Sequence, residues 1–226
     1  MKLSELYSSI QCEGPNTGEP TQFLRFGGCN LRCPGWPCDT EFAVDPKFRD
    51  EWASKTAEAI YDMVPAYPKR ICITGGEPLI QPKEQLSDLV RMLIHEGEHS
   101  IDLFTNGTRP LPSWALWDEV SVVMDWKLPS SGEGDEGIPQ RLTNILFLQP
   151  KDAVKFVVKD WEDVRIAHEV YTSHRAHTSC EWYIGKVWGA GIQDEDLITY
   201  ILNHKLPWRL NVQFHKHIWA PDKRGV

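Results

Sequence analysis

Three cysteines, Cys29, Cys33 and Cys38, lie within ten residues in the stretch CNLRCPGWPC. Thiols so close together in the sequence are typical of a site that binds a metal ion or an iron–sulfur cluster. The chain begins without the continuous apolar stretch of a signal peptide, so we expect a cytoplasmic location. Disulfides are rare in the cytoplasm, and metal ligation is therefore the favoured role for the three thiols.

Two kinds of metal site fit this spacing. A structural zinc ion usually has four protein ligands, and Cys12 is the one further thiol that could serve as the fourth. A [4Fe–4S] cluster held by three cysteines instead leaves one iron open to another ligand. The residues alone leave both sites open, together with accidental clustering, and they favour the iron–sulfur cluster. Cys72 and Cys180 are predicted to be small buried apolar residues.

Further polar and glycine-rich motifs follow apolar runs that have the composition of strands. Gly75 and Gly76 belong to the motif TGGEP, and glycine lets a backbone approach a ligand closely because it has no Cβ. The motifs TNG at 105–107 and DWK at 125–127 end two later runs. Asp125 and Lys127 are costly at the end of an apolar strand unless solvent or a ligand is present.

The elements that must position these motifs alternate between strand and helix. We expect strands at 21–26, 70–74, 101–105, 120–126, 153–158 and 208–214, and helices at 54–64, 83–97, 160–172 and 193–203. This alternation predicts a parallel sheet, either open and doubly wound or a full or partial barrel. In each case, ligands bind at the carboxyl ends of the strands, where the motifs lie. The glycine-rich segment 129–139 is predicted to be a loop that could act as a mobile lid.

Composition excludes several other classes of protein. The chain has 226 residues, 41% hydrophobic and 25% charged, as expected for an ordinary globular protein of one domain. Its formal net charge of −8 and dispersed Lys and Arg residues argue against nucleic-acid binding. No apolar run is long enough for a membrane span.

The cysteine cluster, TGGEP and TNG, in this order, resemble the radical S-adenosylmethionine superfamily. The resemblance implies an α/β fold with a partial (β/α) barrel of about six parallel strands, in a single domain over 1–226 with a cluster-binding loop at 29–40. It also implies that Cys29, Cys33 and Cys38 hold a [4Fe–4S] cluster. S-adenosylmethionine would bind the fourth iron and be cleaved to methionine and a 5′-deoxyadenosyl radical. Four residues separate Cys33 from Cys38, where most members of the superfamily have two.

Two longer motifs narrow the resemblance. The IQ-x-EG segment before the cysteines and the later MD-x-K-x-PSSG segment are similar to those of the 7-carboxy-7-deazaguanine synthase family, and the similarity runs from residue 8 to residue 217. That family is a group of lyases that convert 6-carboxy-5,6,7,8-tetrahydropterin to 7-carboxy-7-deazaguanine with loss of ammonia, a step toward queuosine. The alternative is another radical S-adenosylmethionine enzyme, such as an activase of glycyl-radical proteins.

The resemblance also assigns site residues and cofactors. It implies that the pterin contacts Ile10, Gln11, Cys12, Glu13, Arg25, Thr74 and His215. It implies that S-adenosylmethionine contacts Pro37, Asp39, Gly75, Gly76, Glu77, Asn106, Asp125, Lys127 and Ser130. Thr40 matches a threonine that binds Mg²⁺. As partners, the family implies a homodimer and an electron donor of the flavodoxin or ferredoxin kind.

Overall fold

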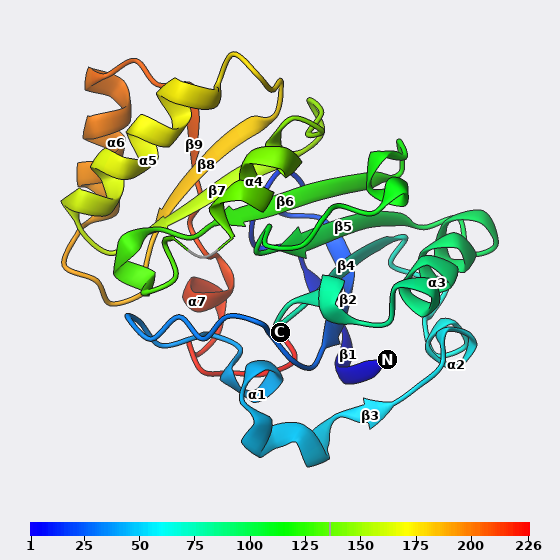
Figure 1. Cartoon of the computed structure of the whole chain (residues 1–226). Helices are drawn as coiled ribbons and strands as arrows, with labels where there is room; N and C mark the ends of the chain where they lie inside the picture. Colours follow the sequence, from blue (N-terminus) through cyan, green and yellow to red (C-terminus); the bar gives the residue numbers. More distant parts are fainter. Residues whose placement is uncertain (136) are drawn as a thin grey trace.

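The computed structural model describes residues 1–135 and 137–226, and one nine-stranded sheet runs through it (Figure 1). The strand order is β3-β1-β2-β4-β5-β6-β7-β8-β9. The strands are β1 (Lys2–Ile10), β2 (Pro20–Phe26), β3 (Ala53–Ser54), β4 (Arg70–Gly75), β5 (Ser100–Thr105), β6 (Val120–Trp126), β7 (Ala153–Val158), β8 (Glu181–Lys186) and β9 (Trp208–Leu210).

Seven of these strands form the parallel part of the sheet. β2 and β4 to β9 pair in parallel, whereas β1 pairs antiparallel with both β2 and β3. β3 and β9 end the strand order, so the sheet does not close on itself. The partial barrel implied by the sequence is therefore confirmed, and it contains one more parallel strand than expected.

Helices cover one face of the sheet. α3 packs on β5, α5 packs on β7, and α6 contacts β8 and β9, as Figure 1 shows. The α-helices are α1 (Glu41–Val44), α2 (Ala57–Tyr61), α3 (Lys83–His95), α4 (Ile138–Ile145), α5 (Trp161–His174), α6 (Asp194–Asn203) and α7 (His215–Ile218). The 3₁₀ turns are η1 (Pro46–Glu51), η2 (Pro78–Ile80), η3 (Ser113–Leu116) and η4 (Pro129–Ser131). None of the described helices has both the length and the apolar character needed to cross a bilayer.

The structure departs from the sequence predictions in several elements. β1 and β8 were not predicted, because their sequences KLSELYSSI and EWYIGK are too polar to form an apolar run. β9 is shorter than the predicted strand at 208–214, since it lies at the sheet edge and pairs with β8 alone. The helix predicted at 54–64 is shorter in the structure, where α2 spans Ala57–Tyr61.

The segment 129–139 is also not entirely a loop. Pro129–Ser131 forms the 3₁₀ turn η4, and α4 begins at Ile138. Ser131 is fully buried, so the start of this segment is packed into the molecule rather than exposed like a lid. Position 136 of the predicted loop lies outside the described residues.

The alternation of side chains along the parallel strands separates the apolar core from the concave face. Ile73, Leu103 and Phe156 point toward the helices and belong to the main apolar core. Their neighbours along the strands, such as Thr74 and Lys155, line a cavity on the opposite face. Because successive residues of a strand face opposite ways, one strand can serve both the core and the site. Cys72 and Cys180 are buried, as predicted.

Gly75 ends β4 where no other residue type fits. Its φ is +141°, and a Cβ atom there would lie 2.0 Å from the carbonyl oxygen of Phe26, the last residue of β2. The contact is with backbone, so it cannot be relieved by a side-chain rotation. The glycine is therefore required by the close approach of two strand ends.

We expect Gly75→Ala to lower the free energy of unfolding by about 2 to 3 kcal/mol, because it adds backbone strain and a clash. For a chain of this size, this corresponds to a fall of about 5 to 10 °C in the midpoint of thermal unfolding. Gly191→Ala is the matched control, since no described atom lies within 4 Å of the added Cβ. Equal midpoints for the two variants would show that the approach of β2 and β4 imposes no such constraint.

Candidate active site

A cavity of about 230 Å³ opens on the concave face, at the carboxyl ends of the parallel strands. The loop after β2, which carries the three cysteines, forms one wall, and the ends of β4 to β7 form the others. The predicted site residues that line it are Glu13, Arg25, Cys29, Cys33, Pro37, Cys38, Asp39, Thr40, Thr74, Gly75, Gly76, Asn106, Asp125 and Lys127. The structure thus brings most of the predicted site together around one cavity.

The three cysteines fit an iron–sulfur cluster. All are partly buried free thiols that face the cavity. Burial raises the pKa of Cys29 to about 11, and it also raises the pKa of Cys33, although the charge of Lys127 opposes the shift at Cys33. A bound metal must replace these thiol protons. Within residues 1–135 and 137–226, no three Cys, His, Asp or Glu side chains are placed to hold a single ion. A four-iron cluster is larger than one ion and takes its thiolates further apart.

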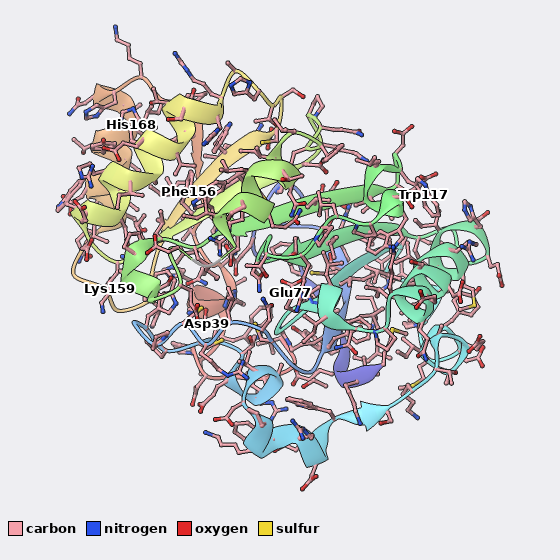
Figure 2. All side chains as sticks on the ribbon, in the orientation of Figure 1. Asp39, Glu77, Trp117, Phe156, Lys159 and His168 are labelled. Atoms are coloured by element: carbon pink, nitrogen blue, oxygen red, sulfur yellow. The ribbon has the colours of Figure 1, made fainter. Side chains whose placement is uncertain are left out.

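Two polar residues follow the last cysteine. The Thr40 hydroxyl lies 3.4 Å from the carbonyl oxygen of Gly75 and 3.6 Å from Sγ of Cys38. It does not cap α1, although it stands at the N-cap position. Asp39 pairs with Lys216 of α7 at 2.8 Å and accepts a hydrogen bond from Gln213 at 3.2 Å, and Figure 2 shows it beside α7. Thr40 is therefore directed at the site, whereas Asp39 ties the cysteine loop to the C-terminal segment.

A chain of alternating charges crosses the floor of the cavity. Nζ of Lys155, whose side chain is 8% exposed, lies 2.8 Å from Oε2 of Glu13 and 3.4 Å from Oδ1 of Asp125. Nζ of Lys127 lies 2.9 Å from Oδ2 of Asp125. Buried charges are tolerated when they are paired in this way. The four side chains therefore depend on one another for their charged states.

These pairs set the protonation of the two carboxylates. Burial by itself would raise the pKa of Asp125, but Lys127 and Lys155 outweigh it and lower this pKa to about 2. Burial likewise opposes ionisation of Glu13, and the charge and hydrogen bond of Lys155 lower the pKa of Glu13 below its ordinary value. Both carboxylates are consequently ionised at neutral pH, and both can accept hydrogen bonds.

Glu13 keeps one oxygen free for a ligand. Its contacts with Lys155 and with the Asn211 amide, at 2.8 and 3.1 Å, both go to Oε2. Among the described residues, Oε1 has no such partner. Asn211 also accepts a hydrogen bond from the N–H of Gly14 at 3.0 Å, which fixes the backbone next to Glu13.

Arg25 stands on β2 at another side of the cavity. Its Nε donates to Glu5 at 3.0 Å and its Nη2 donates to the Tyr7 hydroxyl at 2.8 Å. Both partners come from β1, so this edge strand holds the guanidinium in place. Within residues 1–135 and 137–226, Nη1 has no hydrogen-bond partner, so it is available to a carboxylate in the cavity.

Glu77 does not line the cavity. Its carboxylate is fully buried and accepts hydrogen bonds from the N–H groups of Leu79 and Asn106, at 3.0 and 2.7 Å, and from the Thr105 hydroxyl at 2.9 Å. Glu77 therefore joins the ends of β4 and β5, and it positions Asn106.

Ser130 also turns away from the cavity. Its hydroxyl and its N–H both bind the carboxylate of Asp163 on α5. The side chain and backbone of Ser130 therefore join η4 to α5.

Ile10, Gln11, Cys12 and His215 do not line the cavity either. The Gln11 amide donates to Asp102 at 3.1 Å and accepts from the N–H of Cys12 at 3.2 Å. The Cys12 thiol donates to the carbonyl oxygen of Ile10 at 3.2 Å. His215 is close enough to Glu13 for the two charges to interact, but burial is the larger effect and lowers the His215 pKa. Gln11 and Cys12 therefore bond to other groups of the protein, and His215 lies near Glu13.

Lys155 is not among the predicted site residues, although its position in the sequence carries a signal. A lysine in the middle of the apolar run AVKFVV is as costly as Asp125 at a strand end, unless a partner is present. Asn211 and Gln213 were also missed, because they follow the short strand β9 and their partners Glu13 and Asp39 lie 198 and 174 residues away, beyond the reach of a local pattern.

Known proteins resemble this chain over part or nearly all of its length. The family model of a 4Fe-4S single cluster domain matches residues 15–114. The 7-carboxy-7-deazaguanine synthase of Methanospirillum hungatei is 38% identical over 98% of this chain and 86% of its own length. That of Clostridium acetobutylicum is 32% identical over 100% of this chain and 99% of its own length.

A solved structure agrees on the fold. The crystal structure of QueE from Escherichia coli superposes with a TM-score of 0.72 over 92% of each chain, at 21% identity. At 21% identity this likeness shows the fold, whereas the two sequence relatives are similar enough, over nearly the whole chain, to show the family. The chain belongs to the 7-carboxy-7-deazaguanine synthase family.

Proposed function

We propose that this chain converts 6-carboxy-5,6,7,8-tetrahydropterin to 7-carboxy-7-deazaguanine with release of ammonia, as a radical S-adenosylmethionine enzyme. The observation that carries the proposal is the composition of one cavity. Its wall contains the three cysteines, and its floor and side present the Glu13 carboxylate and the Arg25 guanidinium. These groups match a cluster with an open iron and a substrate that has both N–H donors and a carboxylate.

Cys29, Cys33 and Cys38 would hold the [4Fe–4S] cluster, which together with S-adenosylmethionine would supply radical chemistry for hydrogen abstraction from the pterin. The protein binds, orients and shields the substrate, because the cofactor carries the reactivity. Oε1 of Glu13 accepts hydrogen bonds from the N–H groups on the pyrimidine edge of the pterin. Lys155 keeps this carboxylate ionised and fixes its second oxygen.

Arg25 binds the substrate carboxylate through Nη1. Its other nitrogens are held by Glu5 and Tyr7, so little conformational freedom is lost when the substrate binds. Thr74 is its parallel-register neighbour on β4 and lines the same wall. With Glu13 and Arg25 at its two ends, the pterin has a single orientation relative to the cysteine wall.

S-adenosylmethionine contacts the wall next to the cysteines. Pro37, Gly75, Gly76 and Asn106 line this wall, and the Asn106 side-chain nitrogen lies 3.9 Å from Sγ of Cys29. Lys127 and Asp125 offer a cation and an anion at the exit of β6 to the methionine carboxylate and the ribose. Glu77 acts on this ligand only through the β4 and β5 loops.

Mg²⁺ binds at Thr40 in the same proposal. A hydroxyl and a backbone carbonyl, here that of Gly75, are the hard oxygen donors that Mg²⁺ prefers. A substrate carboxylate held by Arg25 would supply a further oxygen ligand, and water molecules would fill the remaining positions. The proposal also includes the family's homodimer and an electron donor of the flavodoxin or ferredoxin kind.

The whole proposal is tested by an anaerobic assay. Reduced enzyme with a reconstituted cluster is mixed with the carboxypterin, S-adenosylmethionine and Mg²⁺, and the product mass is measured. We expect the mass of 7-carboxy-7-deazaguanine. Cleavage of S-adenosylmethionine without this product would instead indicate a different radical enzyme, and absence of cleavage would reject both.

Glu13→Gln is expected to weaken pterin binding about 10- to 100-fold, because a charged hydrogen bond of about 1.5 to 3 kcal/mol is lost. The dissociation constant is measured by titration of the cluster-loaded enzyme. Iron content should stay unchanged, since Glu13 is not a cluster ligand. Glu19→Gln is the control: Glu19 belongs to the same loop, is half exposed and pairs with Arg70. A dissociation constant equal to that of the control would remove Glu13 from the substrate site.

Thr40→Ala is expected to raise the Mg²⁺ concentration for half-maximal product formation at least about tenfold, because the metal loses a hydroxyl ligand. Thr40→Ser keeps the hydroxyl and should stay within about twofold of the wild type. The measurement is the initial rate as a function of Mg²⁺ concentration. If the alanine variant responds to Mg²⁺ like the serine variant, Thr40 is not a ligand.

A further inference from the structure

Cys33 has an unusual backbone conformation. Its φ is +47°, in the left-handed region that residues other than glycine rarely adopt. Such a conformation persists only where the surroundings hold it, and it often marks a functional site. The middle one of the three cysteines therefore needs an anchor outside its own loop.

Glu133 supplies this anchor from a distant part of the chain. Its Oε1 accepts hydrogen bonds from two successive backbone N–H groups, those of Arg32 at 2.7 Å and Cys33 at 3.3 Å. Glu133 does not line the cavity, so it reaches the backbone behind the cysteine and not the ligand space. A carboxylate that binds both N–H groups fixes the peptide orientation that directs the Cys33 side chain.

Glu133 is itself held by η4. Its N–H donates to the Ser131 hydroxyl at 3.1 Å, and that hydroxyl donates to the carbonyl oxygen of Leu128 at 2.6 Å. Ser131 is fully buried. Next to it, Ser130 is bound by Asp163 at the start of α5. The anchor is therefore continuous with the helical layer of the barrel.

The four residues between Cys33 and Cys38 rest on the same turn. The N–H of Gly35 donates to the carbonyl oxygen of Ser131 at 3.1 Å, and Lys159 donates to the carbonyl oxygen of Gly35 at 2.8 Å. A Cβ atom on Gly35 would lie 1.7 Å from the carbonyl oxygen of Ser130. The longer spacing of this chain is thus accommodated by contact with η4, and Figure 2 labels Lys159 at this side of the molecule.

We propose that Glu133 is a positioning residue for the [4Fe–4S] cluster: it holds Cys33 in its ligating conformation and adds a negative charge beside the cluster. The proposal rests on the cluster of the proposed function. A negative charge close to a cluster stabilises its oxidised state, so Glu133 lowers the reduction potential. The motif PSSGE then acts on the backbone of the cluster loop, on the side away from the cavity, and does not bind the cofactor directly.

The test measures iron release from the cluster-loaded, anaerobic protein to a chelator, without turnover. We expect Glu133→Ala to release iron at least about tenfold faster than the wild type, because Cys33 loses its anchor. Glu133→Gln keeps a carbonyl acceptor for the two N–H groups and should stay within about twofold of the wild type. Asp135→Ala is the matched control, since Asp135 is an exposed acid of the same loop. Cys33→Ala gives the rate expected when the ligand itself is lost.

A second measurement isolates the charge. The reduction potential of the cluster should become more positive in Glu133→Gln than in Asp135→Asn, since both variants lose one charge but only Glu133 lies against the cluster loop. Wild-type iron release in Glu133→Ala, or equal potentials in the two amide variants, would overturn the proposal. A wild-type protein that holds its cluster but forms no deazaguanine would reject the proposed function, while iron release would still decide the role of Glu133.

Discussion

The buried contact of Lys155 with Glu13 and Asp125 is the interaction on which the site depends. A lysine in the middle of β7 would be costly without partners, and burial opposes the ionisation of both carboxylates, which Lys155 offsets at Glu13 and offsets together with Lys127 at Asp125. The charged states of Lys155, Glu13 and Asp125 therefore depend on one another. The result is a carboxylate held in a known orientation and ionised state at the floor of the cavity, before any ligand binds.

A second constraint governs the wall that carries the cysteines. The loop after β2 contains no helix or strand before α1, so its shape depends on the residues that contact it from outside the cavity. Glu77 fixes the neighbouring ends of β4 and β5, and Glu133 binds the backbone of Cys33 from the far side. Both carboxylates act on backbone N–H groups and neither lines the cavity. Acidic residues of conspicuous motifs can thus shape a site from outside it.

The local patterns of the sequence were sufficient for the cysteine cluster, the glycine motif and most parallel strands. Apolar runs with β-type composition predicted β2, β4, β5, β6 and β7 within one residue at each end. Elements that lack such runs were missed or misplaced, since β1, β8 and β9 owe their form to pairing with neighbours. The motifs also indicated which loops meet, because carboxyl ends of parallel strands gather at one edge.

The sequence by itself determined which residue types are available at the carboxyl ends of the parallel strands. Through the family resemblance, it also indicated which chemistry these residues serve. Tertiary structure alone decided which way each side chain turns. Glu77 and Ser130 belong to site motifs but bind the protein, whereas Lys155 belongs to an ordinary apolar strand and supports the site. The physical reason is that a buried polar group takes the nearest available partner in space, and most of those partners lie from 28 to 142 residues away in the chain.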